Sequence, residues 1–156
     1  MAIVYLGLGS NLGDKKLNLK RAIEKINGQI GNIIDLSAYY YSAPLGFESS
    51  NDFVNLVLSL ESNLDPTEVL VKTQKIECEL GRKSKSLNNK YTDRLIDIDI
   101  LFYNSLIINN SCLQIPHPKL HERAFVINPL AEIAPTFIHP TLNKSLAELA
   151  CIKEDL

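Results

Sequence analysis

Residues 95–103 read Leu-Ile-Asp-Ile-Asp-Ile-Leu-Phe-Tyr, and their alternation of apolar and acidic side chains decides the fold. Neighbouring side chains of a β-strand point to opposite faces of the sheet. The three isoleucines are therefore expected to point into the core, whereas Asp97 and Asp99 should share the other face. The stretch predicts a strand that carries two carboxylates side by side.

Patterns before this strand predict the rest of the sheet and two helices. Helical spacing and capping residues are typical of helix starts at Asp14 and at Asp65-Pro66-Thr67-Glu68. The expected elements, in order, are a strand over 3–9, a helix from the Asp14 cap to about 27 with Gly28 as its stop, strands over 34–40 and 53–61, and a helix over 66–80 that Gly81 ends. This β-α-β-β-α-β order indicates an α+β fold of the ferredoxin-like type. It implies a four-stranded antiparallel sheet with both helices on one face.

The remaining third of the chain should add smaller elements to this core. We expect a hairpin after Tyr103, a short helix near 122–128 and a helix near 145–153. With 156 residues, 46% apolar and 22% charged, the chain is expected to form a single domain, residues 1–156. A domain of this size can bury a core unaided, so we expect a monomer.

Charge, hydropathy and cysteine usage exclude several classes of partner. The net charge of -2 gives no general attraction to nucleic acid, and no apolar run approaches the length that crosses a bilayer. Residues 1–5 lack the basic segment of a secretory signal. Cys78, Cys112 and Cys151 have no metal-type spacing and are expected to be reduced, mostly buried thiols. We therefore expect a cytoplasmic protein.

The paired carboxylates suggest a metal. Two like charges this close on an apolar strand repel each other and resist desolvation, and a divalent cation relieves both problems. Hard oxygen ligands from few side chains suit Mg²⁺, which completes its shell with water and phosphate. A solvated outer face of an antiparallel sheet is the alternative explanation.

A basic stretch, residues 82–94, precedes the carboxylates. Its cations and Asp93 give a net charge of +4, in a chain that is acidic overall; the cations are Arg82, Lys83, Lys85, Lys90 and Arg94. Cations beside a metal site suit polyphosphate transfer, because they neutralise charge on the transferring and leaving groups. Most basic runs are simply solvated loops, and that reading stays open here. The combination favours an enzyme that consumes ATP.

Two further patterns bear on the ligand. Residues 7–13 lack both the P-loop and the G-x-G-x-x-G spacing, so Gly9 and Gly13 are expected to serve a tight turn after the first strand. Phe53 and Asn55 share one face of their strand, and an aromatic ring beside an amide suits a flat heterocycle. Phe125 could add a second ring, although such residues are often only core packing.

The histidines give weaker signals. Pro116 and Pro118 make a helix across His117 and His121 unfavourable, which argues against a zinc pair. His117 is better placed for a phosphate or ribose contact, and His139 is expected at the surface.

Segments in a fixed order across nearly the whole chain resemble the 6-hydroxymethyl-7,8-dihydropterin pyrophosphokinase family of folate biosynthesis. The most specific are Arg94-Leu95-Ile96-Asp97-Ile98-Asp99 and the later Pro116-His117-Pro118. The others are Gly9-Ser10-Asn11, Ser42-Ala43-Pro44-Leu45-Gly46, Phe53-Val54-Asn55, Gln74-Lys75-Ile76-Glu77 with Gly81-Arg82, and Arg123-Ala124-Phe125.

The resemblance implies a reaction and a set of residues for it. The hydroxymethyl oxygen of the reduced pterin would attack the β-phosphorus of ATP, giving the pterin diphosphate and AMP. Asp97 and Asp99 would hold two Mg²⁺ ions and, with Arg82 and Arg94, form the catalytic group. The implied ATP-binding residues are Gln74, Glu77, Arg82, Arg94, Ile100, His117 and Arg123. The implied pterin-binding residues are Ser42, Ala43, Pro44, Leu45, Phe53, Asn55 and Phe125.

One departure from the family and two rival classes stay open. Residues 91–95 read Tyr-Thr-Asp-Arg-Leu where many members have an aromatic-Gly-Pro-Arg-Thr run, so Lys83, Lys85, Lys90 and Tyr91 receive no role. A non-catalytic module that binds RNA or a small effector is one rival, although the paired aromatic motifs of RNA-binding sheets are missing. Another ATP-dependent transferase with a different acceptor is the second.

Overall fold

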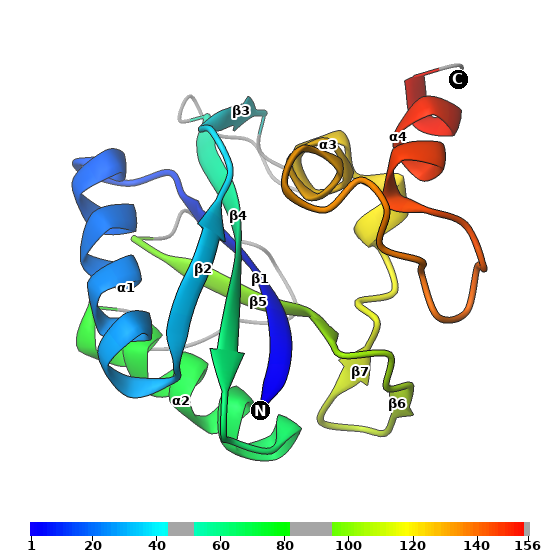
Figure 1. Ribbon diagram of the computed structural model, residues 1–156. Coiled ribbons are helices and arrows are strands. Elements are labelled where there is room, and N and C mark those ends of the chain that lie inside the picture. The colour runs from blue at the N-terminus through cyan, green and yellow to red at the C-terminus, as the bar shows by residue number, and fades with distance from the viewer. Residues whose placement is uncertain (44–51, 82–94, 155–156) are drawn as a thin grey trace.

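The computed structural model describes residues 1–43, 52–81 and 95–154, and its elements alternate between strands and helices (Figure 1). The strands are β1 Ala2–Ser10, β2 Asn32–Leu36, β3 Tyr40–Ser42, β4 Phe53–Ser62, β5 Asp97–Tyr103, β6 Ile108–Asn109 and β7 Gln114–Ile115. The α-helices are α1 Lys15–Gln29, α2 Pro66–Glu79, α3 Ala124–Ile133 and α4 Leu146–Glu154, with a 3₁₀ turn η1 at Leu120–Glu122. The predicted hairpin and the two C-terminal helices are thus present.

The main sheet is antiparallel and has β1 at its centre. Its strand order is β2-β4-β1-β5, and the short β3 also pairs with β4. The two-stranded sheet of β6 and β7 is separate. The predicted mixed fold with an antiparallel sheet is therefore confirmed.

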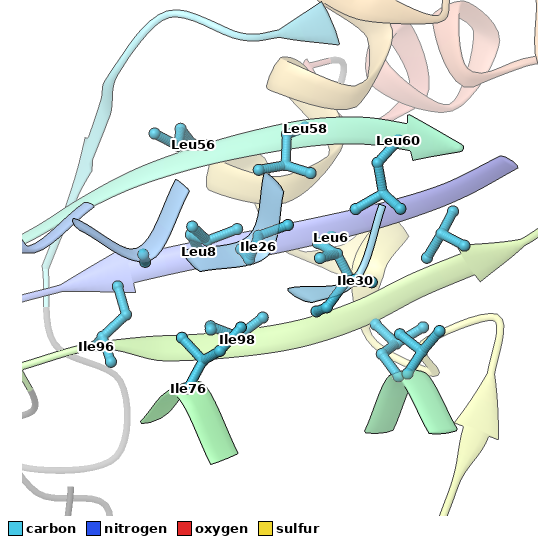
Figure 2. Close-up of a cluster of buried hydrophobic side chains, with 14 of the residues drawn as sticks. Leu6, Leu8, Ile26, Ile30, Leu56, Leu58, Leu60, Ile76, Ile96 and Ile98 are labelled. Carbon is cyan, nitrogen blue, oxygen red and sulfur yellow. The ribbon is translucent and has the colours of Figure 1, made fainter. Parts of the chain in front are cut away.

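Helices cover both faces of this sheet (Figure 1). One face packs against α1 and α2, where Leu6, Leu8, Leu58 and Ile98 meet Ile26 and Ile76 (Figure 2). The other face packs against α3 and α4 in a second cluster, which includes Tyr5, Val57, Phe102, Ile127 and Leu149. Placing α1 and α2 on one face is what the sequence predicts, because their apolar stripes and the even-numbered strand residues must be buried together.

Both helix starts follow the predicted caps. The Asp14 carboxylate accepts from the Leu17 N–H at 3.2 Å. At α2 the capping box is complete, with Asp65 accepting from the Glu68 N–H at 2.8 Å and Glu68 accepting in return from the Asp65 N–H at 3.1 Å.

The predicted stop of α1 at Gly28 is wrong. Gly28 lies inside the helix, and a Cβ there would meet nothing within 4 Å. A Cβ on Gly31 would lie only 2.0 Å from the Glu61 carbonyl oxygen. The chain therefore needs glycine at 31, where it passes closely over β4, rather than at 28.

The predicted strand 34–40 is divided into β2 and β3. Ser37 bonds Val57 twice, through its N–H at 2.9 Å and through its hydroxyl, which accepts from the Val57 N–H at 2.9 Å. The next N–H, on Ala38, leaves the sheet and donates to Glu132 on α3 at 2.8 Å. A side chain from a distant helix thus interrupts the ladder.

Two expectations about burial are wrong. Cys78, Cys112 and Cys151 are all exposed. His139 is only 3% exposed, because its Nδ1 accepts from the N–H groups of Thr141 and Leu142 and its ring packs edge-on against Phe102. Among the described helices, none is both long and apolar enough to span a membrane.

The packing predicts the cost of a core truncation. Leu58→Ala removes a side chain that is 0% exposed, and we expect it to lower the free energy of unfolding by about 2–5 kcal/mol. Leu36→Ala, at a side chain 48% exposed on β2, should change it by less than about 0.5 kcal/mol. Urea denaturation measures both, and equal losses would contradict this account of the core.

Candidate active site

Strand register brings three candidate positions into one row across the sheet. Gly9 of β1 lies opposite Asn55 of β4 and opposite Asp97 of β5, and Gly7 lies opposite Asp99. Directly opposed residues in an antiparallel pair have side chains on the same face. The amide and both carboxylates therefore share the face opposite the α1 and α2 core, with glycines between them.

Gly9 is required by this row, and the expectation that it forms a turn is wrong. A Cβ on Gly9 would lie 2.9 Å from Asn55 Oδ1 and 3.3 Å from the Phe53 ring. No other residue fits without displacing one of these groups. Glycine here lets the Phe53 ring and the Asn55 amide lie close against β1. Gly13 does occupy a turn conformation, with φ +67°.

The orientation of the Asn55 amide is fixed by β3. Its Nδ2 donates to the Tyr40 carbonyl at 3.2 Å and to the Ser42 hydroxyl at 2.8 Å. A carbonyl can only accept, so the amide nitrogen must face β3 and the oxygen must face Gly9. Asn55 is 6% exposed and thus presents a buried hydrogen-bond acceptor at the site.

The carboxylate strand is held from α2. Glu77, only 4% exposed, accepts from the Ile98 N–H at 2.9 Å. Ile98 lies between Asp97 and Asp99, so this bond fixes the backbone that carries both half-buried aspartates. The structure therefore gives Glu77 a strand-anchoring contact, in addition to its place in the pocket described next.

One pocket of about 540 Å³ lies beside β5 and collects most of the predicted nucleotide residues. That volume is within the range of small-molecule sites. The predicted residues in its lining are Gln74, Glu77, Asp97, Asp99, Ile100, His117 and Arg123. Sequence reasoning missed the other main wall, residues 110–114 of the β6–β7 hairpin together with Lys119. Hairpin residues carry no motif that could have revealed this.

His117 is neutral near pH 7. Burial, helped by the charges of Arg123 and Lys119 and opposed by Asp97, lowers its pKa from 6.5 to about 4. Its Nδ1 accepts from the Lys119 N–H at 3.1 Å, so the proton of the neutral ring belongs on Nε2. His117 can therefore donate one hydrogen bond without bringing a charge.

The donor set of the pocket fits a magnesium-bound polyphosphate. Asp97 and Asp99 supply hard carboxylate oxygens, and Arg123 and Lys119 supply positive charge in the same lining. Within the three described ranges, no group of three or more His, Cys, Asp or Glu side chains is arranged to hold a metal. Two protein carboxylates leave the remainder of an octahedral shell to water and phosphate oxygens.

The heterocycle candidates adjoin this pocket rather than line it. Phe53 begins β4 and Phe125 lies in the first turn of α3. Both side chains are described by the structure, and their rings do not contact each other. The Arg123 guanidinium lies 5.9 Å from the centre of the Phe125 ring. Asp97 belongs both to the pocket lining and to the Asn55–Gly9 row, so it joins the two regions.

Several predicted residues fall outside the described ranges. These are Pro44, Leu45, Arg82 and Arg94, together with Lys83, Lys85, Lys90 and Tyr91 of the basic stretch. Of the predicted loop before β4, the structure describes Ser42, which bonds Asn55, and the exposed Ala43.

Comparison with known proteins identifies the family. Residues 5–135 match the family model described as 7,8-dihydro-6-hydroxymethylpterin-pyrophosphokinase (HPPK). The chain is similar to the 2-amino-4-hydroxy-6-hydroxymethyldihydropteridine pyrophosphokinase of Porphyromonas gingivalis, with 46% identity over 90% of this chain and 95% of that protein. It is also similar to the protein of the same name from Aquifex aeolicus, with 45% identity over 95% of this chain and 90% of that protein. The chain belongs to the 7,8-dihydro-6-hydroxymethylpterin-pyrophosphokinase family.

Larger proteins contain a matching region. The folic acid synthesis protein of Dictyostelium discoideum is 42% identical over 90% of this chain, which spans 21% of that protein. A crystal structure of Plasmodium falciparum HPPK-DHPS superposes with a TM-score of 0.79 and 19% identity over 97% of this chain, which spans 44% of the solved chain. At that identity the superposition supports the fold alone.

The geometry at Gly9 predicts a selective effect. Gly9→Ala should weaken binding of 6-hydroxymethylpterin by about tenfold or more, because the new methyl group crowds Asn55 and Phe53. The same substitution at Gly28, where a Cβ meets nothing, should leave binding unchanged and stabilise α1 by about 0.5–1 kcal/mol. Fluorescence titration and thermal unfolding measure these effects. Unchanged pterin affinity in Gly9→Ala would contradict the proposed shape of the site.

The lowered pKa of His117 predicts a pH dependence of stability. Between about pH 6.5 and 4 the unfolded chain binds a proton at this imidazole that the folded protein does not, so stability falls as the pH falls through this window. His117→Gln should reduce that loss. Urea unfolding at both ends of the window tests this prediction. Burial also lowers the pKa of His139, but that residue contributes equally to the unaltered protein and to the His117→Gln variant. An unaltered slope would contradict the assignment.

Proposed function

We propose that this chain transfers the pyrophosphoryl group of ATP to 6-hydroxymethyl-7,8-dihydropterin, as a step of folate biosynthesis. The observation that carries the proposal is the position of Asp97, between a pocket with nucleotide-type residues and the Phe53–Asn55 surface. A phosphoryl donor and a flat acceptor bound on either side would place the reacting atoms beside the carboxylate pair. The names of the close relatives support the same reaction.

In the proposed reaction the hydroxymethyl oxygen forms a bond to the β-phosphorus of ATP while the bond from that phosphorus to the α-phosphate oxygen breaks. The hydroxyl proton is lost to solvent or to a phosphate oxygen, and AMP leaves. No covalent enzyme intermediate is needed, so rate enhancement would come from alignment and charge neutralisation.

Asp97 and Asp99 would hold Mg²⁺, with two ions expected from the family resemblance. The metal, when bound, would neutralise charge on the phosphate oxygens. The half-buried position of both aspartates and the Glu77 contact to the strand between them keep this ligand pair in place.

The other pocket residues would orient the nucleotide. His117 would donate from Nε2 to a phosphate or ribose oxygen, and Arg123 would neutralise phosphate charge. Gln74 and Ile100 line the same pocket and would contact the rest of ATP. Arg82 and Arg94, which the resemblance adds to the catalytic group, remain proposals from the sequence.

The pterin would bind over the Asn55–Gly9 row. Phe53 and Phe125 would stack on its two faces, and Asn55 Oδ1 would accept from an N–H of its edge. The backbone of Ser42, Ala43, Pro44 and Leu45 would complete the polar contacts, as the resemblance implies.

Three broader features belong to the same proposal. The strand order supports a ferredoxin-like arrangement for residues 1–103 within a single domain, 1–156. Free thiols at all three cysteines support a reducing compartment such as the cytoplasm. We propose a monomer whose partners are its small-molecule substrates, without nucleic acid or membrane.

An assay with ATP, Mg²⁺ and 6-hydroxymethyl-7,8-dihydropterin tests the function, with AMP as the expected product. Removal of Mg²⁺ with a chelator should stop the reaction. Asp97→Asn and Asp99→Asn should each lower turnover by about 100-fold or more, whereas Asp35→Asn, an exposed carboxylate on β2, should retain it.

The products separate this reaction from its rivals. ADP would indicate ordinary phosphoryl transfer, and no nucleotide product from a folded sample would refute the proposed enzyme. Full turnover in both aspartate variants would refute the metal site.

A further inference from the structure

One carboxylate joins α3 to the interrupted edge of the sheet. Glu132, in the last turn of α3, accepts from the Tyr40 hydroxyl at 2.7 Å and from the Ala38 N–H at 2.8 Å. Ala38 lies in the break between β2 and β3, and Tyr40 begins β3. A charged acceptor with two donors makes hydrogen bonds stronger than neutral ones. We call this pair of bonds the Glu132 bridge.

Tyr40 connects the bridge to the buried amide of the site. It lies opposite Asn55 in the β3–β4 register, and its carbonyl accepts from Asn55 Nδ2 at 3.2 Å. Ser42 lies two residues further along β3, and its hydroxyl accepts from the same Asn55 Nδ2 at 2.8 Å. Because β3 has only three residues, its position depends strongly on contacts at its start.

The same helix carries a candidate stacking ring. Phe125 and Glu132 are seven residues apart in α3, close to two full turns, so they lie on one face of the helix. That helix contacts both β3 and β4. Pro129, between the two, lacks the N–H that would bond the Phe125 carbonyl, which weakens the helix internally. The bridge is a polar contact that holds α3 against the sheet edge, in addition to the apolar packing of the helix.

We propose that Glu132 is a positioning residue for pterin recognition, which acts through Tyr40 to hold α3 and β3 at a fixed relative position. In this way it sets Phe125 of α3 against Asn55 of β4, because β3 holds the Asn55 amide through Tyr40 and Ser42. The inference rests on the proposed function, because it assumes that these two residues contact the pterin. In this proposal Glu132 acts through its bonds to Tyr40 and Ala38 rather than by contacting the pterin.

The phenol remains a donor under all ordinary assay conditions. Burial, the hydrogen bond to Glu132 and the Glu132 charge together raise the pKa of Tyr40 to about 12. Of the described groups in the bridge, Glu132 is the acidic one that faces the Tyr40 phenol, and the Ala38 N–H is uncharged. The bridge should therefore be independent of pH near neutrality.

A double-mutant cycle separates positioning from general stability. Tyr40→Phe, Glu132→Gln and the double variant are compared with the unaltered protein by calorimetric titration. The probes are 6-hydroxymethylpterin, with Mg²⁺ and saturating α,β-methylene-ATP, and α,β-methylene-ATP with Mg²⁺ alone. Glu148→Gln is the matched control, because the Glu148 carboxylate on α4 likewise accepts from one N–H and one hydroxyl, both of Ser145.

Each single variant should weaken pterin binding by about three- to tenfold and leave the affinity for the ATP analogue within about twofold. The double variant should lose little more than either single variant, because both weaken the same hydrogen bond between the Tyr40 hydroxyl and Glu132. Glu148→Gln should lower thermal stability comparably without selective loss of pterin affinity.

The inference is overturned if the two losses add independently, if ATP affinity falls equally, or if Glu148→Gln reproduces the selective effect. Pterin binding unchanged in both single variants also overturns it. These outcomes differ from failure of the proposed function, in which the unaltered protein itself forms no AMP and binds no pterin. That result would remove both proposals.

Discussion

The antiparallel pairing of β1 with β4 on one side and β5 on the other is the constraint on which the site depends. Only this register sets Asn55, Gly9 and Asp97 in one row. A one-residue slip of β5 would turn Asp97 and Asp99 toward the leucines of the core, and a one-residue slip of β1 would turn Leu6 and Leu8 out of it. The large apolar cluster under α1 and α2 excludes that alternative, so core packing and site geometry are fixed by the same hydrogen bonds.

The two faces of the sheet differ in what they pack against. The face under α1 and α2 supplies most of the apolar burial, and α2 also sends Glu77 to the edge of β5. On the other face α3 and α4 cover only part of the sheet, over Tyr5, Val57 and Phe102. The row of Gly9, Asn55 and Asp97 lies on this same face, and the hairpin β6–β7 with the segment after it lines one side of the pocket.

Sequence reasoning succeeded where one local period or one cap decides the structure. Alternation placed Asp97 and Asp99 on a common face, and the capping box at Asp65 located the start of α2. It failed where the cause is a distant contact. Gly9 resembles a turn residue until its neighbours on β4 and β5 are known, and β2 and β3 are divided by a carboxylate 94 residues away in the chain. His139 is buried by a local turn that no periodicity indicates.

The contact between Glu77 and Ile98 has a second consequence, for solubility. β5 ends the strand order of the main sheet, and unpaired N–H and C=O groups on such a strand can template pairing with another chain. Here the Ile98 N–H donates to the Glu77 carboxylate, and the Leu101 carbonyl accepts from the His117 N–H at 3.1 Å. Residues that line the pocket beside β5 thus also use outward-facing backbone groups that another strand would need for pairing.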